Sequence, residues 1–411
     1  MITVEDALTQ ILKEIRPLGL ESVTLANSLC RTLGEDIRAA RPNPPWDNSA
    51  MDGYALRAGD ATGAAKDSAV TLDVIYDLPA GSTPKGPVNK GQAVRIMTGA
   101  PVPPGADAVV MVELTASLTE GKVDIRGSVR PGDNIRKAGE DFKAGDIVLK
   151  KGAYVRPAEI AMLATVGVSY LFVHKRPRVA VLSTGDELVE IGQTPAPGKI
   201  SNSNGHALAA LVAESGAVPV QLGIARDTKE SLKEKLSIAR SCDCIISSGG
   251  VSVGDYDFVK DVLKELGSQM IFWKVSMKPG KPLAFGVIGG VPAFGLPGNP
   301  ISSMVAFEQF VRPSLLKMSG RGPICRAELN ATLTKDVKIK PGRTNFLRGL
   351  LTLNDGGASV APLEGQGSGV ISTMVAANCY IIVGMDSTGY AKGAVVKVQP
   401  FDPSVFLKVR A

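Results

Sequence analysis

Residues 177–225 read PRVAVLSTGDELVEIGQTPAPGKISNSNGHALAALVAESGAVPVQLGIA. The segment opens with an apolar run that predicts a buried strand, and it closes with a second such run, AVPVQLGIA. Residues 201–216 between them predict a helix, because Asn202 can cap its first turn and Gly216 can end its last. A strand, a helix and a strand in this order are typical of a parallel sheet that is covered by helices.

The same alternation continues to about residue 320. The run CDCIISSGG at 242–250 predicts a third strand that ends in glycines, and Asp227 with Glu230 resembles a capping box at the start of a helix over 228–240. Further strands are predicted at 270–277, 282–288 and 291–297, and further helices at 257–267 and 300–318. We therefore expect a mostly parallel α/β sheet with helices on both faces.

The flanking regions have a different texture. Residues 1–40 predict two helices, the second over 25–37, and residues 142–173 predict a strand and then a helix with Pro157 near its start. Residues 41–141 alternate short apolar runs with Gly and Pro turns, which is typical of an all-β barrel or sandwich. Short alternating strands return near the C-terminus. The predicted domains are a discontinuous helical region at 1–40 and 142–173, an inserted β domain at 41–141, an α/β domain at 174–322 and a β domain at 326–411.

The composition of the chain limits the classes of function and partner that it can have. A chain of 411 residues predicts two to four domains. The net charge of +6 favours small anionic ligands, and no block of Lys and Arg supports a nucleic-acid partner. No apolar run of about 20 residues predicts a membrane span. Five cysteines, of which only Cys242 and Cys244 are close, predict buried reduced thiols and a cytoplasmic protein. Two histidines leave acid–base and metal chemistry to carboxylates and lysines.

The segment WDNSAMDGY at 46–54 predicts an ordered loop, because Asp, Asn and Ser side chains bond to nearby backbone groups. Two carboxylates, an amide and a hydroxyl exceed what a simple turn requires. A functional loop and an elaborate turn are equally compatible with these residues.

Four segments follow predicted strands, where ligands bind in open parallel sheets. They are STGDEL at 183–188, SSGGVSVGDYDF at 247–258, KPGKP at 278–282 and LPGNPISS at 296–303. Glycines let backbone N–H groups approach an anion, and helix starts favour negative charge. None matches a Walker or G-x-G-x-x-G motif. Any one of them alone is compatible with an ordinary turn, but four at one sheet edge favour a ligand site.

Lys278 and Lys281 flank Pro279 and Gly280, which holds two ammonium groups near one point and suits a doubly charged oxyanion. A solvated surface pair is the alternative. Lys274 is predicted to share the strand and the face of Lys278.

The carboxylates in these segments are the natural Mg²⁺ ligands or acid–base groups of the chain, because Mg²⁺ prefers oxygen ligands. An Asp at a turn or a helix cap is the alternative for each, and Asp227 is a candidate cap. The carboxylates concerned are Asp186, Glu187, Asp255 and Asp257.

Taken together, these motifs resemble the MoeA / gephyrin E-domain family of molybdopterin molybdenumtransferases over nearly the whole chain. The motifs that carry the resemblance occur in order: DNSAMDGYA (47–55), RIMTGAPVPPGADAVVMVE (95–113), NIRKAGED (134–141), STGDEL, CDCIISSGGVSVGDYDF (242–258), FWKVSMKPGKP (272–282) and LPGNPISS. Trp46 stands where the family commonly has Phe, and GDYDF replaces the more usual GEADY.

The resemblance implies a multidomain subunit with a molybdopterin-binding α/β domain and a C-terminal β-barrel beside the helical region and the inserted β domain. It also implies a homodimer whose active cleft lies between subunits, and a molybdopterin adenylyltransferase as the upstream partner. The implied reaction takes adenylylated molybdopterin and molybdate, with Mg²⁺, to molybdenum cofactor and AMP. Molybdate and tungstate are similar tetrahedral dianions, so the sequence favours neither.

The resemblance also implies roles for residues. The implied catalytic residues are Asp47, Asp141, Glu187, Asp227, Asp257, Lys274 and Lys278, and the implied metal ligands are Glu187 and Asp257. The change to GDYDF leaves Asp255 and Asp257 as alternatives. The implied substrate-binding residues are Lys281, Ser302, Ser183, Thr184, Gly185, Ser248, Gly249, Gly250, Pro297, Gly298, Asn299, Arg343, Arg348 and Ser368.

Two alternatives remain open at this point. A molybdopterin adenylyltransferase has a single α/β domain with a similar glycine-rich loop, and the additional β domains argue against it. A non-catalytic scaffold of the gephyrin type is the second, and the retained carboxylates and lysines argue for activity instead.

Overall fold

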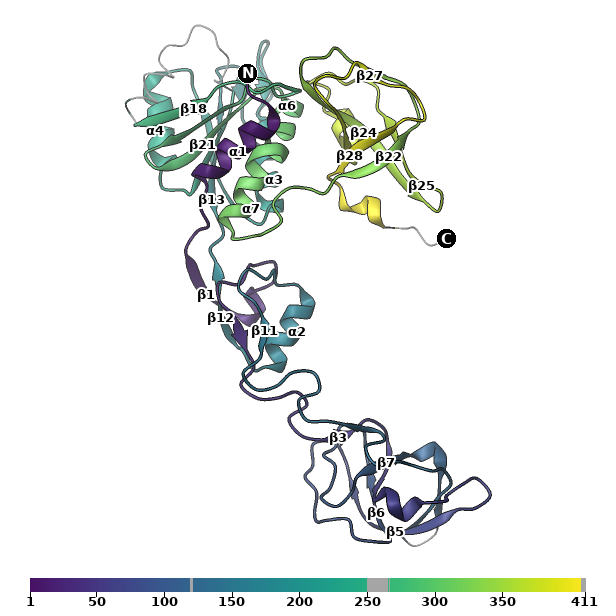
Figure 1. The fold of residues 1–411 in the computed structure, drawn as a ribbon. Coiled ribbons are helices and arrows are strands. Elements are labelled where there is room, and N and C mark those ends of the chain that lie inside the picture. The colour runs from purple at the N-terminus through teal and green to yellow at the C-terminus, as the bar shows by residue number, and fades with distance from the viewer. Residues whose placement is uncertain (119–120, 250–264, 266, 408–411) are drawn as a thin grey trace. The chain divides into compact units, whose positions relative to one another are not determined.

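The computed structural model describes residues 1–118, 121–249, 265 and 267–407 (Figure 1). The chain forms two compact units. The first unit contains residues 1–34, 152–156 and 170–411, and the second contains residues 35–151 and 157–169. No helix in the described ranges is both long enough and apolar enough to cross a membrane.

A six-stranded sheet forms the centre of the first unit, in the order β16-β13-β17-β21-β20-β18. The three pairings from β16 to β21 are parallel, and the pairings of β20 with β21 and with β18 are antiparallel. This arrangement confirms the predicted mostly parallel α/β sheet. The strands are β13 (Arg178–Thr184), β16 (Val218–Ala225), β17 (Cys244–Ser248), β18 (Ser268–Phe272), β20 (Ala284–Ile288) and β21 (Val291–Leu296).

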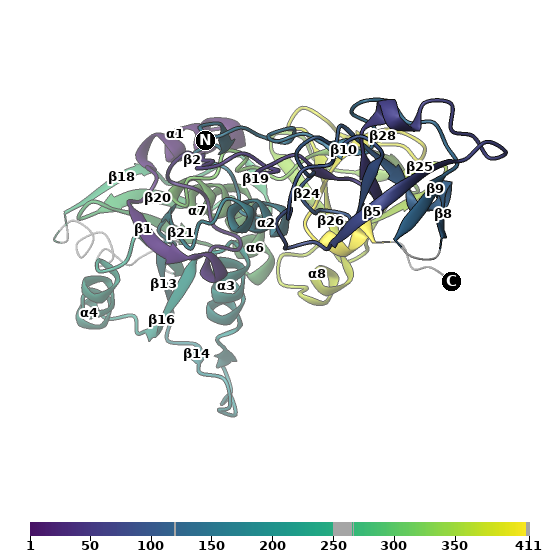
Figure 2. The same cartoon turned by 90° about the horizontal axis from the view of Figure 1, so that it is seen from below.

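Helices cover both faces of this sheet because successive residues of a buried strand point to opposite sides. Val181 packs with α1, α3 and the helices after β21, whereas Leu182 packs with α4 on the other face (Figure 1). Figure 2 shows the same sheet from below, with the segment that carries β14 (Leu188–Val189) extending away from it. The helices are α1 (Val4–Glu14), α3 (Ser203–Glu214), α4 (Lys229–Ala239), α6 (Pro300–Ala306), the π-helical turn η4 (Phe307–Val311) and α7 (Arg312–Met318).

Helix caps agree with the sequence at α3 and differ at α4. The Asn202 side chain accepts a hydrogen bond from the Gly205 amide at 3.1 Å, as predicted. At α4 the cap is Thr228, whose hydroxyl accepts from the Ser231 amide at 3.2 Å. The prediction of Asp227 as the cap was therefore wrong by one residue.

The C-terminal region of the first unit is a closed five-stranded β-barrel, as the resemblance implied. Its strands follow the order β24-β25-β22-β28-β26, and the pairing of β24 with β26 closes it. A short strand, β19 (Met277–Lys278), leaves the α/β part and pairs in parallel with β24. The barrel strands are β22 (Leu329–Leu333), β24 (Thr344–Asn354), β25 (Gly357–Pro362), β26 (Cys379–Val383) and β28 (Val395–Pro400).

The second unit holds the predicted inserted β domain, a six-stranded sheet in the order β7-β4-β6-β5-β9-β8. Gly53 is required in it, because a Cβ atom there would lie 1.9 Å from the Val110 carbonyl oxygen. The strands are β4 (Gly53–Leu56), β5 (Val70–Leu78), β6 (Gln92–Ile96), β7 (Ala108–Met111), β8 (Thr115–Leu118) and β9 (Lys122–Ile125), and the unit also contains α2 (Pro157–Thr165), β2 (Ile37–Arg38), β3 (Asn48–Ser49), β10 (Ile135–Arg136) and β11 (Ile147–Leu149).

The predicted helix over 25–37 was wrong. Only the 3-10 turn η1 (Leu25–Asn27) forms there, after β1 (Leu20–Thr24), which pairs with β12 (Tyr170–His174). The following backbone groups bond to a distant segment, since the Cys30 amide donates to the Val155 carbonyl at 2.9 Å. Long-range hydrogen bonds therefore replace the helical ones that the local pattern suggested.

The predicted strand over 270–277 is confirmed only at residues 270–272. β18 ends at Phe272, and the Val275 amide then bonds to the Lys281 carbonyl oxygen at 3.1 Å. Lys274 and Lys278 do not share a strand, so strand alternation does not place them on one face. The helix predicted at 257–267 lies almost wholly outside the described residues.

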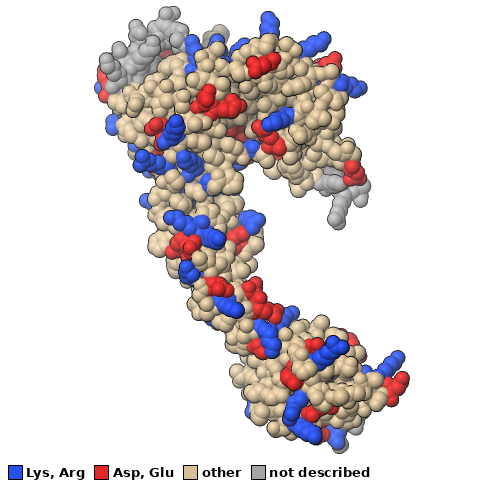
Figure 3. All heavy atoms as spheres, viewed as in Figure 1, with Lys and Arg blue, Asp and Glu red and all other residues tan. Residues whose placement is uncertain are grey.

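Charges are mixed over the surface. On the face drawn in Figure 3, Lys and Arg side chains are interspersed with Asp and Glu on both units, as expected for a net charge of +6. The predicted buried thiols are confirmed, because Cys242 and Cys244 are buried and unpaired, and burial raises the pKa of the Cys244 thiol.

Candidate functional site

Four strand ends meet at the carboxyl edge of the α/β sheet. The Gly185 amide, after β13, donates to the Ala225 carbonyl at the end of β16 at 3.3 Å. The Gly249 amide, after β17, donates to the Leu296 carbonyl at the end of β21 at 3.1 Å. The structure thus brings together three of the four segments predicted at this edge.

A pocket of about 400 Å³ opens at these strand ends, which we call the serine–asparagine pocket. Asn204 organises it, because its amide nitrogen donates to the Ser248 hydroxyl and to the Gly298 carbonyl, both at 2.7 Å. The other polar side chains of its lining belong to Ser183, Thr184, Glu187, Ser201, Asn202 and Ser203. A hydroxyl- and amide-rich wall of this kind suits a polar organic ligand.

Glycine is needed at the wall where β13 and β17 end. Gly249 has φ +89°, and a Cβ atom there would lie 2.5 Å from the Thr184 carbonyl oxygen. Its backbone therefore approaches β13 more closely than any side chain would permit.

Carboxylates lie beside this pocket. Asp186 and Asp227 exchange hydrogen bonds, since each amide donates to the carboxylate of the other at 3.2 Å. Lys199 donates its ammonium to the Asp186 carbonyl at 2.7 Å, which ties the outer loop to the same place. Within the described ranges, no three His, Cys, Asp or Glu side chains gather closely enough to hold a metal ion by themselves. Asp255, Asp257 and Gly250 lie outside those ranges.

A second pocket, of about 1030 Å³, lies between the α/β part and the barrel, and we call it the lysine pocket. Lys278 reaches it because β19 pairs with β24 of the barrel. The two parts also meet where the Ile301 amide donates to the Ser368 carbonyl at 3.2 Å. Its polar lining residues are Lys278, Lys281, Asn299, Ser302, Arg343, Gln366 and Ser368.

The lysine pocket is strongly electropositive. Three of its lining residues are cations, and none of the lining residues in the described chain is acidic. The loop at 297–300 contributes Pro297 and Asn299 to this pocket and Gly298 and Pro300 to the serine–asparagine pocket. One loop therefore separates a cationic pocket from a polar one whose described lining includes the Glu187 carboxylate, and a single extended ligand with an anionic end can occupy both.

Arg348 does not line the lysine pocket, because its side chain is fully buried behind it. Its guanidinium donates to the carbonyls of Gly365 at 2.9 Å and Gly367 at 3.1 Å. Burial lowers the pKa of this guanidinium. Arg348 thereby holds the loop that presents Ser368.

Lys274 is exposed and also does not line either pocket.

Asn204 and Gln366 line these pockets but were not among the predicted site residues. Asn204 lies in SNSNG at the predicted start of the helix over 201–216, where its side chain can cap the helix, and Gln366 lies in GQGSG, a glycine-rich run between two barrel strands. The glycines on both sides of Gln366 are the signal that could have marked this loop.

Asp47 and Asp141 lie in the second unit. The Asp47 carboxylate accepts from the Lys137 ammonium and from the Ala138 amide, both at 2.8 Å. The Lys137 hydrogen bond, and after it the Ala138 amide, holds the pKa of Asp47 below its usual value. Asp141 accepts from the Asn43 side chain at 3.0 Å. Both carboxylates sit where the segments around β3 and β10 run together, so two distant motifs of the sequence form one surface.

The fold and these pockets define a multidomain α/β protein with a polar pocket at the carboxyl ends of its parallel strands and a cationic pocket between its α/β part and a barrel. Three family profiles match this chain: the MoeA N-terminal region (domain I and II) over residues 2–167, a probable molybdopterin binding domain over 180–317, and the MoeA C-terminal region (domain IV) over 330–401.

Individual relatives agree with these matches. A molybdopterin molybdenumtransferase of Haemophilus influenzae is 36% identical over 406 residues, which are 98% of this chain and 99% of the relative. One from Staphylococcus aureus (strain COL) is 37% identical over 401 residues, 97% of this chain and 95% of the relative. The crystal structure of a molybdopterin biosynthesis moeA protein from Pyrococcus horikoshii OT3 superposes with a TM-score of 0.84 at 31% identity, covering 98% of this chain and 100% of that one. The chain belongs to the molybdopterin molybdenumtransferase (MoeA) family.

Proposed function

We propose that this chain inserts molybdate into adenylylated molybdopterin, and that it releases AMP and molybdenum cofactor. Membership of the family makes the chain a transferase of molybdenum cofactor biosynthesis. The adenylylated substrate, the release of AMP and the roles of single residues are our proposal.

The lysine pocket is the observation that carries the proposal. Molybdate is a tetrahedral dianion, and a pocket with three cations, a serine hydroxyl and no acidic lining residue in the described chain matches its charge and its hydrogen-bonding capacity. Lys278 and Lys281 supply point charges, Arg343 adds a planar guanidinium, and Ser302 can donate its hydroxyl proton.

The serine–asparagine pocket is proposed to hold the pterin phosphate and the nucleotide. Ser183, Thr184 and Ser248 can donate hydroxyl protons to phosphate oxygens, and Gly185, Gly249 and Gly298 let the backbone come close. Asp227 and Asp186 hold the neighbouring loops together by their mutual hydrogen bonds. Because the two pockets share the loop at 297–300, a substrate in one pocket lies beside molybdate in the other.

Mg²⁺ fits the oxygen-only donors at this edge, because it is usually held by one or two carboxylates together with substrate phosphates. We propose Glu187, which lines the serine–asparagine pocket, and Asp257 as the residues that would hold it. The ion, when bound, neutralises charge on the phosphate oxygens of the leaving nucleotide.

The proposal extends to Asp47, Asp141 and Lys274, which line neither pocket. We propose that they act in the complete active cleft of a homodimer, with a molybdopterin adenylyltransferase as the supplier of substrate. The predicted domain boundaries and the cytoplasmic location also remain predictions. Light scattering on the purified chain tests the dimer, and a monomeric mass would remove that part of the proposal.

Replacing Lys278 by Gln tests the molybdate site. A hydrogen bond to a charged group contributes about 1.5–3 kcal/mol, so the molybdate concentration for half-maximal AMP release should rise roughly 10- to 150-fold. Lys66→Gln removes the same charge from the second unit and should leave that concentration unchanged. An unaltered half-saturation in Lys278→Gln would remove this residue from the proposed role.

AMP release also separates the proposed function from its alternatives. Purified chain that forms no AMP from adenylylated molybdopterin and molybdate, while it remains folded, would support a scaffold. Turnover with ATP and unmodified molybdopterin would support an adenylyltransferase instead.

A further inference from the structure

A third pocket, of about 810 Å³, lies at the opposite end of the same parallel sheet. Lys175 and Arg176 on its wall immediately precede β13, and Gly216 and Ala217 precede β16. The serine–asparagine pocket lies instead beyond the carboxyl ends of β13 and β17, and the lysine pocket lies beside the loop that follows β21. We call this third pocket the basic pocket, and the proposed transfer reaction makes no use of it.

Backbone hydrogen bonds build the walls of the basic pocket. The His174 amide donates to the Thr32 carbonyl at 3.0 Å, and Arg31 donates its guanidinium to the His174 carbonyl at 2.7 Å. Gly320, at φ +72°, packs so closely on the His174 ring that a Cβ atom would lie 2.3 Å from it. This contact fixes the end of α7, and with it Arg321, beside residues 174–176.

Three cations of this pocket lack a counter-ion. Lys175, Arg176 and Arg321 make no ion pair and no side-chain hydrogen bond with any described residue. The other charges are already matched, because Arg31 pairs with Glu21 and Glu214 lies 3.6 Å from Arg326. The pocket therefore carries a surplus of three positive charges on groups that are free to bind an anion.

Tyr154 holds one of these cations in a defined orientation. The Cζ atom of Arg321 lies 4.0 Å from the centre of the Tyr154 ring, so the guanidinium rests on the ring. A guanidinium in this position keeps its N–H edge free to donate two parallel hydrogen bonds to phosphate oxygens. Arg176 lies close enough to act electrostatically on the same tyrosine.

The negative ends of two helix dipoles offset only part of the positive charge in the basic pocket. The C-terminal caps of α3 and α7, Ser215 and Ser319, both line the pocket, and helix C-termini attract cations. Each end carries roughly half a negative charge, so two ends offset about one of the three cations. A surplus of about two charges remains, which calls for a ligand with at least two negative charges.

We propose that the basic pocket binds a pyrophosphate group, either free or as part of a nucleoside diphosphate. Two linked phosphates match the surplus charge, and all three unpaired cations, Lys175, Arg176 and Arg321, line the pocket that would hold them. A ligand bound here lies at the far end of the sheet from the molybdate site and does not compete with it directly.

Calorimetric titration of the full chain with inorganic pyrophosphate tests this assignment. We expect two classes of site, because the lysine pocket is also cationic. Lys278→Gln with Lys281→Gln should abolish one class, and Lys175→Gln with Arg176→Gln should weaken the other at least tenfold. Lys66→Gln with Lys90→Gln removes two charges from the second unit and serves as the matched control.

Arg321→Lys and Tyr154→Leu test the orienting stack. Each keeps the positive charge of the pocket, and each should weaken the second class of site while leaving the first unchanged. A parallel titration with ADP distinguishes the ligands: tighter binding than pyrophosphate assigns a nucleotide, and equal binding assigns the pyrophosphate group alone.

The proposal fails if the Lys175→Gln, Arg176→Gln variant titrates like the Lys66→Gln, Lys90→Gln control. The three cations would then only stabilise the C-terminal ends of α3 and α7. If the double variant does not fold, Arg176→Gln alone is used, together with amide exchange at 30–33 and 213–217 of the unaltered chain. Pyrophosphate must slow exchange there, and unchanged exchange overturns the assignment. Loss of the lysine-pocket class alone would count against the proposed function and not against this pocket.

Discussion

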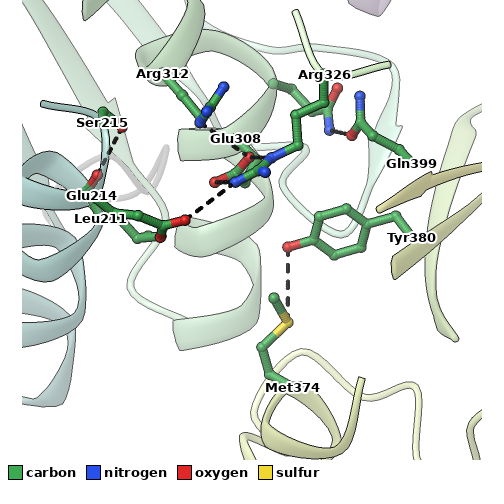
Figure 4. Close-up of polar contacts among 10 residues, drawn as sticks. Leu211, Glu214, Ser215, Glu308, Arg312, Arg326, Met374, Tyr380 and Gln399 are labelled. Atoms are coloured by element: carbon green, nitrogen blue, oxygen red, sulfur yellow. Dashed lines mark hydrogen bonds and ion pairs between the residues drawn. The ribbon is translucent and has the colours of Figure 1, made fainter. Parts of the chain in front are cut away.

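Glu308 is the perturbation with the clearest expected cost. Its carboxylate accepts from Arg326 at 2.5 Å from Nε and 3.2 Å from Nη2, and it lies 4.0 Å from Arg312 (Figure 4). Burial acts to lower the pKa of Arg326, but the Glu308 hydrogen bond raises it above the ordinary value. Burial and the neighbouring Arg326 lower the pKa of Arg312.

The position of this cluster explains its importance. Glu308 belongs to the helical segment after β21, whereas Arg326 begins the connection into the barrel. Beside it, Gln309 donates to Gln399 of β28 at 2.6 Å, and the buried Tyr380 of β26 packs nearby (Figure 4). The cluster therefore joins the two parts that line the lysine pocket.

We expect Glu308→Ala to destabilise the first unit by about 3–5 kcal/mol, because its removal leaves two largely buried guanidinium groups with only one carboxylate partner among the described residues, that of the exposed Glu214, 3.6 Å from Arg326. The Glu308 side chain is only 4% exposed, and those of Arg326 and Arg312 are 15% and 18% exposed. With a urea m-value of about 2–3 kcal/mol/M, the unfolding midpoint should fall by roughly 1–2.5 M.

Tryptophan fluorescence during urea unfolding measures this effect. Trp46→Phe leaves Trp273 as the reporter, which belongs to the first unit. Glu328→Ala is the matched control, because Glu328 pairs with Lys397 at 2.9 Å on the exposed side of the barrel and such pairs contribute little. Equal midpoints for the Glu308→Ala and Glu328→Ala variants would refute the reasoning.

Three further predictions concern single residues. Gly53→Ala should destabilise the second unit by about 1–3 kcal/mol or more, since the Val110 carbonyl cannot move away, and Trp46 fluorescence during urea unfolding measures the loss. The lowered pKa of Asp47 contributes stability that is present above its unfolded pKa and is lost as the pH falls through the folded pKa, so Asp47→Asn should flatten the decline in stability below about pH 4, and an unchanged slope would contradict this. Arg348→Met should speed amide exchange at 363–368 about tenfold or more, because the carbonyls of Gly365 and Gly367 lose their donor, and it should raise the molybdate half-saturation.

The order of strands and helices in the α/β part could be predicted because its strands are buried on both faces and read as continuous apolar runs. In the inserted domain, VTLDVIYDL at 70–78 is one of the short apolar runs between turns, and it coincides with β5. The helix expected at 25–37 failed for the opposite reason. Its apolar spacing was helical, but the backbone of this segment bonds to residues 153–155 and 172, and no local pattern records that.

The residues that line the lysine pocket also divide into some that could be predicted from the sequence and some that could not. Ser302 was implied by the family resemblance, and Lys278 and Lys281 were predictable because they lie in a short motif, KPGKP, where prolines and a glycine restrict the chain. Gln366 was not, since it joins them only through the pairing of β19 with β24, two segments that are distant in the sequence. When strand pairing between two domains closes a pocket, the sequence of neither paired segment indicates the contact.

Thr228 illustrates how a small error in a local rule changes the chemistry of a site. The rule that favours Asp as a helix cap applies equally to Asp227 and to the threonine that follows it. Because the Thr228 hydroxyl takes the Ser231 amide, the Asp227 carboxylate is left to accept from the Asp186 amide at 3.2 Å, and Asp186 accepts from Asp227 in return. Because Thr228 is the cap, the Asp227 carboxylate can link the two loops that follow β13 and β16. A shift of the cap by one residue therefore places Asp227 beside the candidate site and not in a helix cap.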